Sequence, residues 1–242
     1  MTSSFLSWSF GLGRYFGIEV RIHWTFVLFI VMRLLQSQDF KFAALYLGIL
    51  FLSVLVHEYG HCFMARRFRL RADQILLWPF GGLAFVAPGR NAREDFWIAF
   101  GGPLTHLPTA ALALGGLLYQ GAVPHLQMDL LDPVGFSQLP PGWPGLVLLL
   151  VFKVQLLLFG FNVFLPAYPM DGGRILVSLL LPRLGAMKTS GILVATTALS
   201  GIYLLTSSES IIAFFLIFTA YELWHMRKIG AIYSHPSFCH TR

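Results

Sequence analysis

Two histidines and a glutamate within one apolar segment have the residue types and the spacing for metal-dependent chemistry. His57 and His61 are four residues apart, so on an α-helix their imidazoles lie on one face, about one turn from each other. Both can therefore reach a single metal ion. Glu58 follows His57 directly and points away from that axis, where its carboxylate can meet water held by the metal. The pattern predicts a metal site with its own base.

The pattern His-Glu-x-x-His is the one that hydrolytic zinc sites use, and its surroundings here are unusual. The run from Phe42 to Met64 is almost wholly apolar, and Glu58 is its only acidic residue. Ionisable groups are costly inside a lipid-length helix, and where they occur they mark functional sites. The alternative is a chance match, or two hydrogen-bonded core histidines in a buried helix. The apolar surroundings favour the functional interpretation.

Composition predicts an integral membrane protein. Of the 242 residues, 56% are hydrophobic and only 12% are charged, whereas a globular domain has about a quarter charged residues. The formal net charge of +6 does not indicate nucleic-acid binding, because the basic residues lie beside apolar runs and are explained by membrane topology. We expect a single polytopic membrane domain over residues 1–230, followed by a short cytoplasmic tail, 231–242. The two cysteines, Cys62 and Cys239, lie in an apolar run and in this tail, which argues against a disulfide framework.

The expected fold class is an all-α membrane protein with about six transmembrane helices and a small membrane-associated β-hairpin after the second span. The hairpin is expected at 74–87, where two short strand-like runs flank Gly81 and Gly82. Residues 1–21 are interpreted as an interfacial lead-in, and 175–181 as a short helix or re-entrant piece. The predicted spans are 22–36, 42–65, 96–119, 146–165, 191–205 and 211–226.

Charge asymmetry predicts the orientation. The densest basic cluster, 66–71, follows the second span, whereas residues 120–144 contain neither lysine nor arginine. By the positive-inside rule the first segment is cytoplasmic and the second is not. Both termini are then cytoplasmic, and we expect a multi-pass protein of a bacterial inner membrane.

Two histidines leave a catalytic zinc site one protein ligand short, because such sites use three ligands plus water. Asp171 is a candidate, since it follows a proline-broken segment and precedes Gly172 and Gly173, where the backbone can turn sharply. Its expected depth matches that of the histidines. The alternative is that Asp171 only caps the helix that follows it.

These motifs resemble the site-2 protease family of intramembrane zinc metalloproteases. The resemblance covers roughly residues 20–182 and is carried by the following segments: His57-Glu58-x-x-His61, Asn162, Pro166 to Gly173, Gly101-Gly102-Pro103 and the hairpin glycines. It implies a catalytic core over about 42–182, built from the second, third and fourth spans. It also implies one zinc per chain, held by His57, His61 and Asp171, with Glu58 as the catalytic carboxylate.

The implied activity is hydrolysis of peptide bonds in a transmembrane protein substrate, near the cytoplasmic face. The sequence departs from the family pattern in two places. His106 stands where the family usually has asparagine, and Asn162 lies nine residues before Asp171 instead of eight. Asn162 or His106 is expected to help stabilise the oxyanion. His106 is also expected among the substrate-binding residues, or else to be a helix-packing group. The strand-like run at Gly81 and Gly82 is expected to hold the substrate extended, or else to form a simple tight turn.

Two other classes of function remain to be weighed. A catalytically inactive membrane scaffold with the same fold would not need Glu58. A metal transporter would need more polar positions along the other spans than this chain has. The intact motif therefore favours the enzyme. Neither the substrate nor the oligomeric state follows from the sequence.

Overall fold

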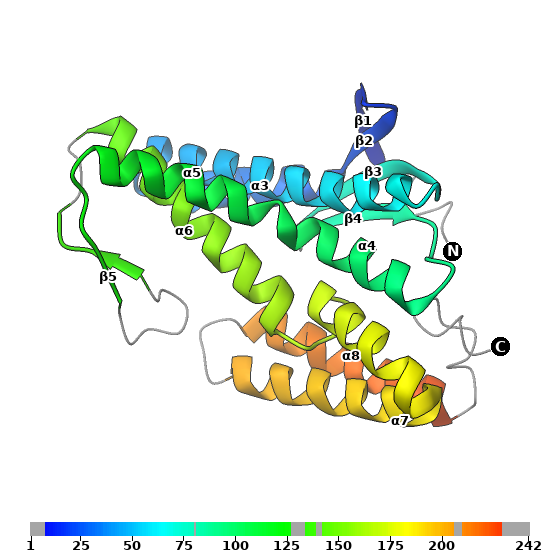
Figure 1. Ribbon diagram of the computed structural model, residues 1–242. Coiled ribbons are helices and arrows are strands. Elements are labelled where there is room, and N and C mark those ends of the chain that lie inside the picture. Colours follow the sequence, from blue (N-terminus) through cyan, green and yellow to red (C-terminus); the bar gives the residue numbers. More distant parts are fainter. Residues whose placement is uncertain (1–7, 80, 127–133, 139–141, 206–209, 229–242) are drawn as a thin grey trace.

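The computed structural model describes residues 8–79, 81–126, 134–138, 142–205 and 210–228. Helices form most of this part, and a four-stranded sheet and a two-stranded sheet lie at opposite ends of them (Figure 1). The predicted tail at 231–242 lies outside the described residues. So do residues 127–133 and 139–141 of the segment 120–144 that lacks lysine and arginine.

The helices follow the predicted apolar runs closely. Their ends coincide with capping residues: Asp39 Oδ1 accepts from the Phe42 N–H at 3.1 Å, and Asn91 Oδ1 accepts from the Glu94 N–H at 3.0 Å. The helices are α2 (Trp24–Gln36), α3 (Phe40–Arg67), α4 (Ala92–Leu104), α5 (His106–Tyr119), α6 (Trp143–Phe164), α7 (Asp171–Leu205) and α8 (Ser210–Lys228).

Two predicted boundaries differ from the structure. The third span is divided into α4 and α5 at Thr105, because Pro103 and Pro108 cannot donate to the helical ladder. The short piece at 175–181 and the fifth span belong to one long element, α7, which turns at Gly185 with φ 72° and ψ 169°. Glycine reaches this conformation without steric cost, and the change of direction is visible in the yellow part of α7 (Figure 1).

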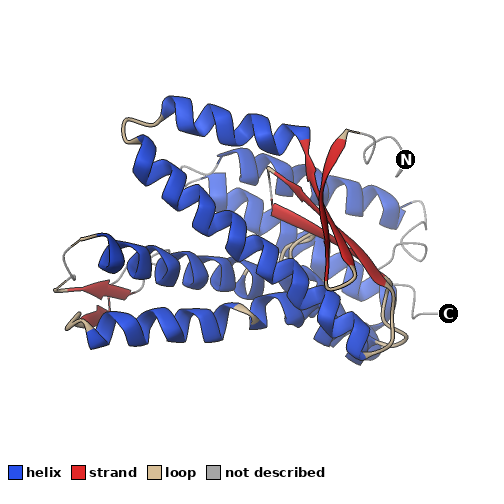
Figure 2. Cartoon of the chain, turned by 90° about the horizontal axis from the view of Figure 1, so that it is seen from above, coloured by secondary structure: helices blue, strands red, loops and turns tan. Residues whose placement is uncertain are grey.

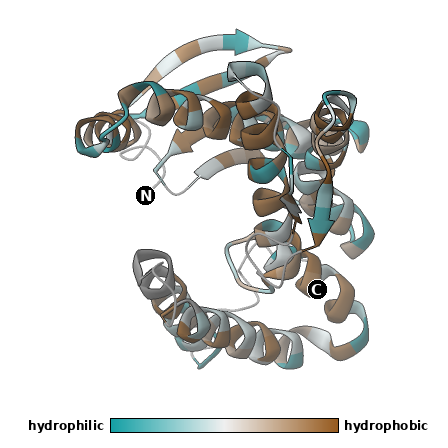
Figure 3. Cartoon of the chain, turned by 90° about the vertical axis from the view of Figure 1, so that its left-hand side faces the viewer, coloured by the Kyte–Doolittle hydropathy of each residue, from teal (hydrophilic) through white to brown (hydrophobic). Residues whose placement is uncertain are grey.

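Within the described residues, three helical segments are long and apolar enough to cross a membrane: Phe40–Arg67, Trp143–Phe164 and Asp171–Tyr203. Hydrophobic residues occur all along the helices (Figure 3), and many of the large ones are exposed, such as Leu112 on α5 at 78%. This is the pattern of helices surrounded by lipid, and the chain is an integral membrane protein. The prediction of about six spans is not confirmed, since α2 has only 13 residues.

The larger sheet has the strand order β1-β2-β3-β4. Its strands are β1 (Ser9–Tyr15), β2 (Ile18–His23), β3 (Ala72–Trp78) and β4 (Gly81–Val86). The outer pairs are antiparallel and the central β2–β3 pair is parallel (Figure 2). The expected hairpin is present as β3–β4, while its association with the membrane stays a prediction. Strands β1 and β2 were not predicted, because residues 1–21 were interpreted as an interfacial lead-in.

The sheet packs on the last turns of α3. Ile18, Val20, Ile75 and Leu77 of the sheet share a buried core with Cys62 and other residues of α3 and α4. Arg66 fixes the junction, because its guanidinium donates to the carbonyl oxygens of Phe16, Gly17 and Ala72 at 2.5–3.2 Å. Arg66 therefore stabilises the junction between α3 and the sheet, in addition to belonging to the basic segment from which the orientation was predicted. The packing places β4 beside the turn of α3 that carries the histidines.

Candidate metal centre

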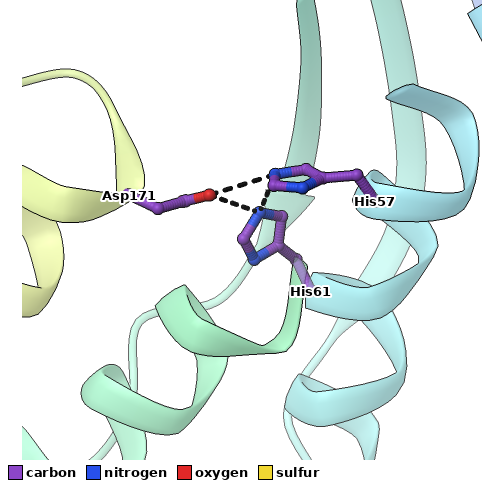
Figure 4. Close-up of side chains that lie close together, drawn as sticks. All are labelled: His57, His61 and Asp171. Atoms are coloured by element: carbon purple, nitrogen blue, oxygen red, sulfur yellow. Dashed lines mark hydrogen bonds and ion pairs between the residues drawn. The ribbon is translucent and has the colours of Figure 1, made fainter. Parts of the chain in front are cut away.

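Three buried side chains from two distant helices meet at one point (Figure 4). His57 and His61 come from α3, and Asp171 is the first residue of α7. The Asp171 Oδ2 atom lies 3.0 Å from Nε2 of His57 and 3.2 Å from Nε2 of His61, and the two Nε2 atoms are 3.0 Å apart. The structure thus brings together the three residues predicted as metal ligands.

The spacing of these atoms fits a zinc ion. A tetrahedral site with zinc–ligand bonds of about 2.0–2.1 Å has its ligand atoms roughly 3.3 Å apart. The observed separations of 3.0–3.2 Å are close to this value. Two imidazole nitrogens and one carboxylate oxygen are also a donor set that catalytic zinc sites use. The residues present therefore suit a zinc ion with one further position open.

The outer nitrogens of both histidines are hydrogen-bonded, which determines which nitrogen can bind a metal. His61 Nδ1 lies 2.7 Å from the carbonyl oxygen of Ile98, and His57 Nδ1 lies 3.0 Å from Nε2 of His106. A carbonyl only accepts, so His61 carries its proton on Nδ1 and presents the Nε2 lone pair to the site.

Glycines allow α4 to approach this site closely. A Cβ on Gly102 would lie 2.6 Å from His57 Nε2, and one on Gly101 would lie 2.8 Å from the carbonyl oxygen of Gly60 on α3. Contacts of this length are not tolerated, so any larger side chain would push the helices apart. Small residues are the usual means of close helix packing in membranes. The absence of side chains at Gly101 and Gly102 therefore allows the α4 backbone to pack directly against the two histidines.

The turn before α7 directs Asp171 into the site. A Cβ on Gly173 would lie 2.7 Å from the carbonyl carbon of Ala167, so the chain can fold back on itself there only with glycine. The Asp171 carboxylate faces the histidines, and its other oxygen is 3.8 Å from Arg174. Asp171 therefore does more than cap the start of α7, because its carboxylate also contacts both histidines.

Glu58 is buried, yet it forms no hydrogen bond with any residue in the described part of the chain. Its carboxyl group lies against β4, because a Cβ on Gly82 would be 2.5 Å from Glu58 Cδ. Its oxygens are not among the fully buried atoms without a partner in the described residues, so they are accessible to water. Its free oxygens are available to bind and deprotonate a water molecule.

The other predicted site residues occupy different surroundings. Asn162 donates through Nδ2 to the Leu158 carbonyl of its own helix at 2.9 Å, and no hydrogen bond joins it to the metal cluster among the described residues. Gly81 and Gly82 begin β4 and pair with Trp78 and Leu77 of β3. His106 is 1% exposed and lies behind His57, away from any open surface.

Sequence reasoning missed two residues next to the site. Gln155 of α6 and Ser53 of α3 are buried and hydrogen-bonded to each other at 2.8 Å, and Gln155 also contacts His106. Both are polar residues inside apolar helices, and this signal could have identified them. The partners themselves are not evident from the sequence, because they are 102 positions apart.

Comparison with known proteins gives a consistent picture. The model of peptidase family M50 matches residues 45–204. The chain is 31% identical over 191 residues to a zinc metalloprotease of Methanocaldococcus jannaschii, a match that covers 77% of this chain and 50% of that protein. It is 36% identical over 116 residues to stage IV sporulation protein FB of Bacillus subtilis, covering 44% of this chain and 40% of that protein.

A solved structure is also similar. The site-2 protease from Methanocaldococcus jannaschii matches with a TM-score of 0.57 and 25% identity, covering 91% of this chain and 94% of that one. The chain spans about half the length of the metalloprotease from the same organism. The mostly helical fold with a small sheet is therefore one that this solved structure shares.

Metal analysis tests the ligand set. We predict close to one zinc per chain in detergent-purified protein, because the three buried ligand atoms lie at zinc-binding distances. His57→Ala and Asp171→Ala should each lose most of the metal, as measured by elemental analysis. Unchanged zinc in Asp171→Ala would remove Asp171 from the ligand set.

The same measurement tests the glycine packing. Gly102→Ala should also lose zinc, because its Cβ would overlap the histidine nitrogens. Gly115→Ala is the matched control, since a Cβ at that position on α5 meets nothing within 4 Å. Equal zinc contents in these two variants would contradict the steric argument.

Proposed function

The chain belongs to peptidase family M50, and on this premise we propose that it is an intramembrane zinc endopeptidase that cleaves membrane-anchored proteins near the cytoplasmic face. The observation that carries the proposal is a buried cluster of His57, His61 and Asp171 with Glu58 beside it, free of hydrogen bonds among the described residues. A metal site with an unpaired base is the minimum that metal-assisted hydrolysis requires.

Glu58 is assigned the proton transfers. A zinc ion in this site would supply a Lewis acid that activates water and polarises a peptide carbonyl. Glu58 accepts the proton of the attacking water and returns it to the nitrogen of the leaving amine. Its carboxyl group lies between α3, which also carries the two histidines, and Gly82 of β4.

Asn162 is assigned to the developing oxyanion. One amide hydrogen of Asn162 is used by the Leu158 carbonyl. The amide group has a second hydrogen, which can be offered to a substrate oxygen. Such a donor typically contributes about 10²–10³-fold to catalysis. The position of His106 behind His57 supports a different role for that residue, so it is not assigned to the oxyanion or to substrate binding.

We assign substrate binding to β4. This strand is at the edge of the sheet, with β3 as its single neighbour, so its other side can pair with an extended peptide. Gly82 lies against Glu58, which means that a peptide paired with β4 would pass the catalytic base. A helical substrate hides its carbonyl groups in its own hydrogen bonds, and pairing as a strand would expose one to attack.

Replacing Glu58 separates an enzyme from an inactive scaffold. Glu58→Gln should keep the fold and the zinc, because the side chain is nearly isosteric and is not one of the ligands. Cleavage of a membrane substrate should fall by about 100- to 10,000-fold, the usual contribution of general acid–base catalysis. Asn162→Ala should cost less, about 10²-fold. Cleavage at the wild-type rate by Glu58→Gln would favour the scaffold.

Photo-crosslinking tests the role of β4. With a photoreactive amino acid at Leu83, which is 45% exposed on β4, the Glu58→Gln protein should crosslink to a bound membrane substrate. The control position is Leu112, which is 78% exposed on α5. Equal crosslinking from the two positions, or none from Leu83, would argue against binding at this edge.

We further propose that the sheet faces the cytoplasm and that both termini are on that side of a bacterial inner membrane. The support is the basic segment 66–71 at the sheet end of α3, whereas residues 120–144 at the other end lack lysine and arginine. The two sheets do lie at opposite ends of the helices (Figure 1).

Cysteine labelling tests this orientation in intact cells, in a background from which the two native cysteines are removed. A membrane-impermeant thiol reagent should label Gln120→Cys from outside, because Gln120 is exposed at the end of α5. Arg71→Cys and Lys228→Cys should react only after the membrane is opened. Labelling of all three from the same side would refute the topology.

A further inference from the structure

Behind the metal cluster, a line of buried polar side chains leads away from His57 and connects three helices. His57 Nδ1 contacts His106 Nε2 at 3.0 Å, and His106 Nδ1 contacts Gln155 Oε1 at 2.5 Å. Gln155 Nε2 donates to Ser53 Oγ at 2.8 Å, and the Ser53 hydroxyl donates to the Ile49 carbonyl at 2.7 Å. His106, Gln155 and Ser53 are 1%, 4% and 5% exposed.

The last hydrogen bond in this line of side chains determines which group donates in each of the others. The carbonyl of Ile49 can only accept, so the Ser53 hydroxyl donates to it and accepts from the Gln155 amide. The Gln155 oxygen must then accept, and His106 must donate to it from Nδ1. A neutral His106 with its proton on Nδ1 has a lone pair on Nε2, and it accepts the proton of His57 Nδ1. Each of the four hydrogen bonds has one donor and one acceptor.

We propose that His106, Gln155 and Ser53 are positioning residues that hold His57 in the tautomer with its Nε2 lone pair directed at the metal. This inference rests on the proposed zinc site and extends it to residues that touch neither metal nor substrate. An outer partner that accepts from a ligand histidine fixes the orientation of the ring and raises its basicity. For His61, this partner is the carbonyl of Ile98. For His57, it is the hydrogen-bonded line of His106, Gln155 and Ser53, which we call the relay.

The location of the relay also fits this role. Nδ1 of His61 meets a backbone carbonyl of α4, whereas Nδ1 of His57 meets the imidazole of His106. His106 stands at the start of α5, directly after the break at Thr105, and its ring packs on that of His57 with centroids 5.0 Å apart. The break thus brings a second imidazole behind the ligand, and α6 supplies the Gln155 amide that orients it.

Gln155→Leu tests the relay, because it removes the acceptor for His106 and keeps the volume of the side chain. The purified variant should bind zinc about 10- to 100-fold more weakly in chelator competition, the usual effect of losing such a partner. Its cobalt-substituted form should show altered d–d absorption bands, since the orientation of His57 is less restrained. Gln155→Glu should recover most of the affinity, because a carboxylate also accepts from His106 Nδ1.

Two serines provide a matched pair. Ser53 and Ser178 are both buried, and each donates to the carbonyl four residues earlier, at 2.7 and 2.9 Å. Only Ser53 also accepts from Gln155. Ser53→Ala should weaken zinc binding measurably, whereas Ser178→Ala should not. This pair keeps the proposal testable if Gln155→Leu fails to fold.

The outcomes are distinct from those that test the proposed function. If the wild-type protein binds no zinc, the metal site itself fails. If the wild type binds zinc, and Gln155→Leu and Ser53→Ala bind it with unchanged affinity and unchanged cobalt spectra, the relay is overturned. If both variants lose thermal stability but keep wild-type affinity and spectra, the side chains only join the helices, which overturns the proposal as well.

Discussion

The closeness of α3 and α4 is the constraint on which the site depends. At Gly60, Gly101 and Gly102 the two backbones approach until no Cβ would fit between them. This approach brings the Ile98 carbonyl to His61 and the break after α4 to His57. The metal ligands are thus held by backbone geometry, which is stiffer than side-chain contact alone. Asp171 can then complete the cluster from a separate helix, because the two histidines already have fixed directions.

In an apolar helix bundle, a polar side chain is also expected to have either a hydrogen-bond partner or a functional role. In the described part of the chain, His57, His61 and Asp171 are engaged with each other, and their outer atoms contact His106, Ile98 and Arg174. Glu58 differs, since no hydrogen bond holds its carboxylate there, and its oxygens are not among the fully buried atoms that lack a partner. They are therefore accessible to water, which the proposed role of Glu58 as a base requires.

The sequence predicted those parts of the site that depend on local spacing. His57, Glu58 and His61 are defined by helix periodicity, and Asp171 by the glycines that follow it. The relay was not predictable, because Ser53 and Gln155 are far apart in the chain and meet only after α3 packs against α6. A similar reason applies to β1 and β2, which were missed: they pair with each other and are joined to the rest of the sheet by the parallel pairing of β2 with β3, more than 50 residues later. In β1, glycine and aromatic residues also obscure any regular alternation.

The sheet and the metal cluster are joined through the end of α3, with consequences for how a substrate is selected. About two turns after Glu58, Arg66 donates to the carbonyls of Phe16, Gly17 and Ala72, and β4 is connected to this junction by its pairing with β3. Gly82 sets the distance between β4 and Glu58, since any Cβ there would displace the carboxylate. In the proposed binding mode, a peptide paired with β4 would pass Glu58 at a distance set by Gly82. Selection would then depend on whether the substrate can unwind into a strand there, more than on the identity of the side chains it presents.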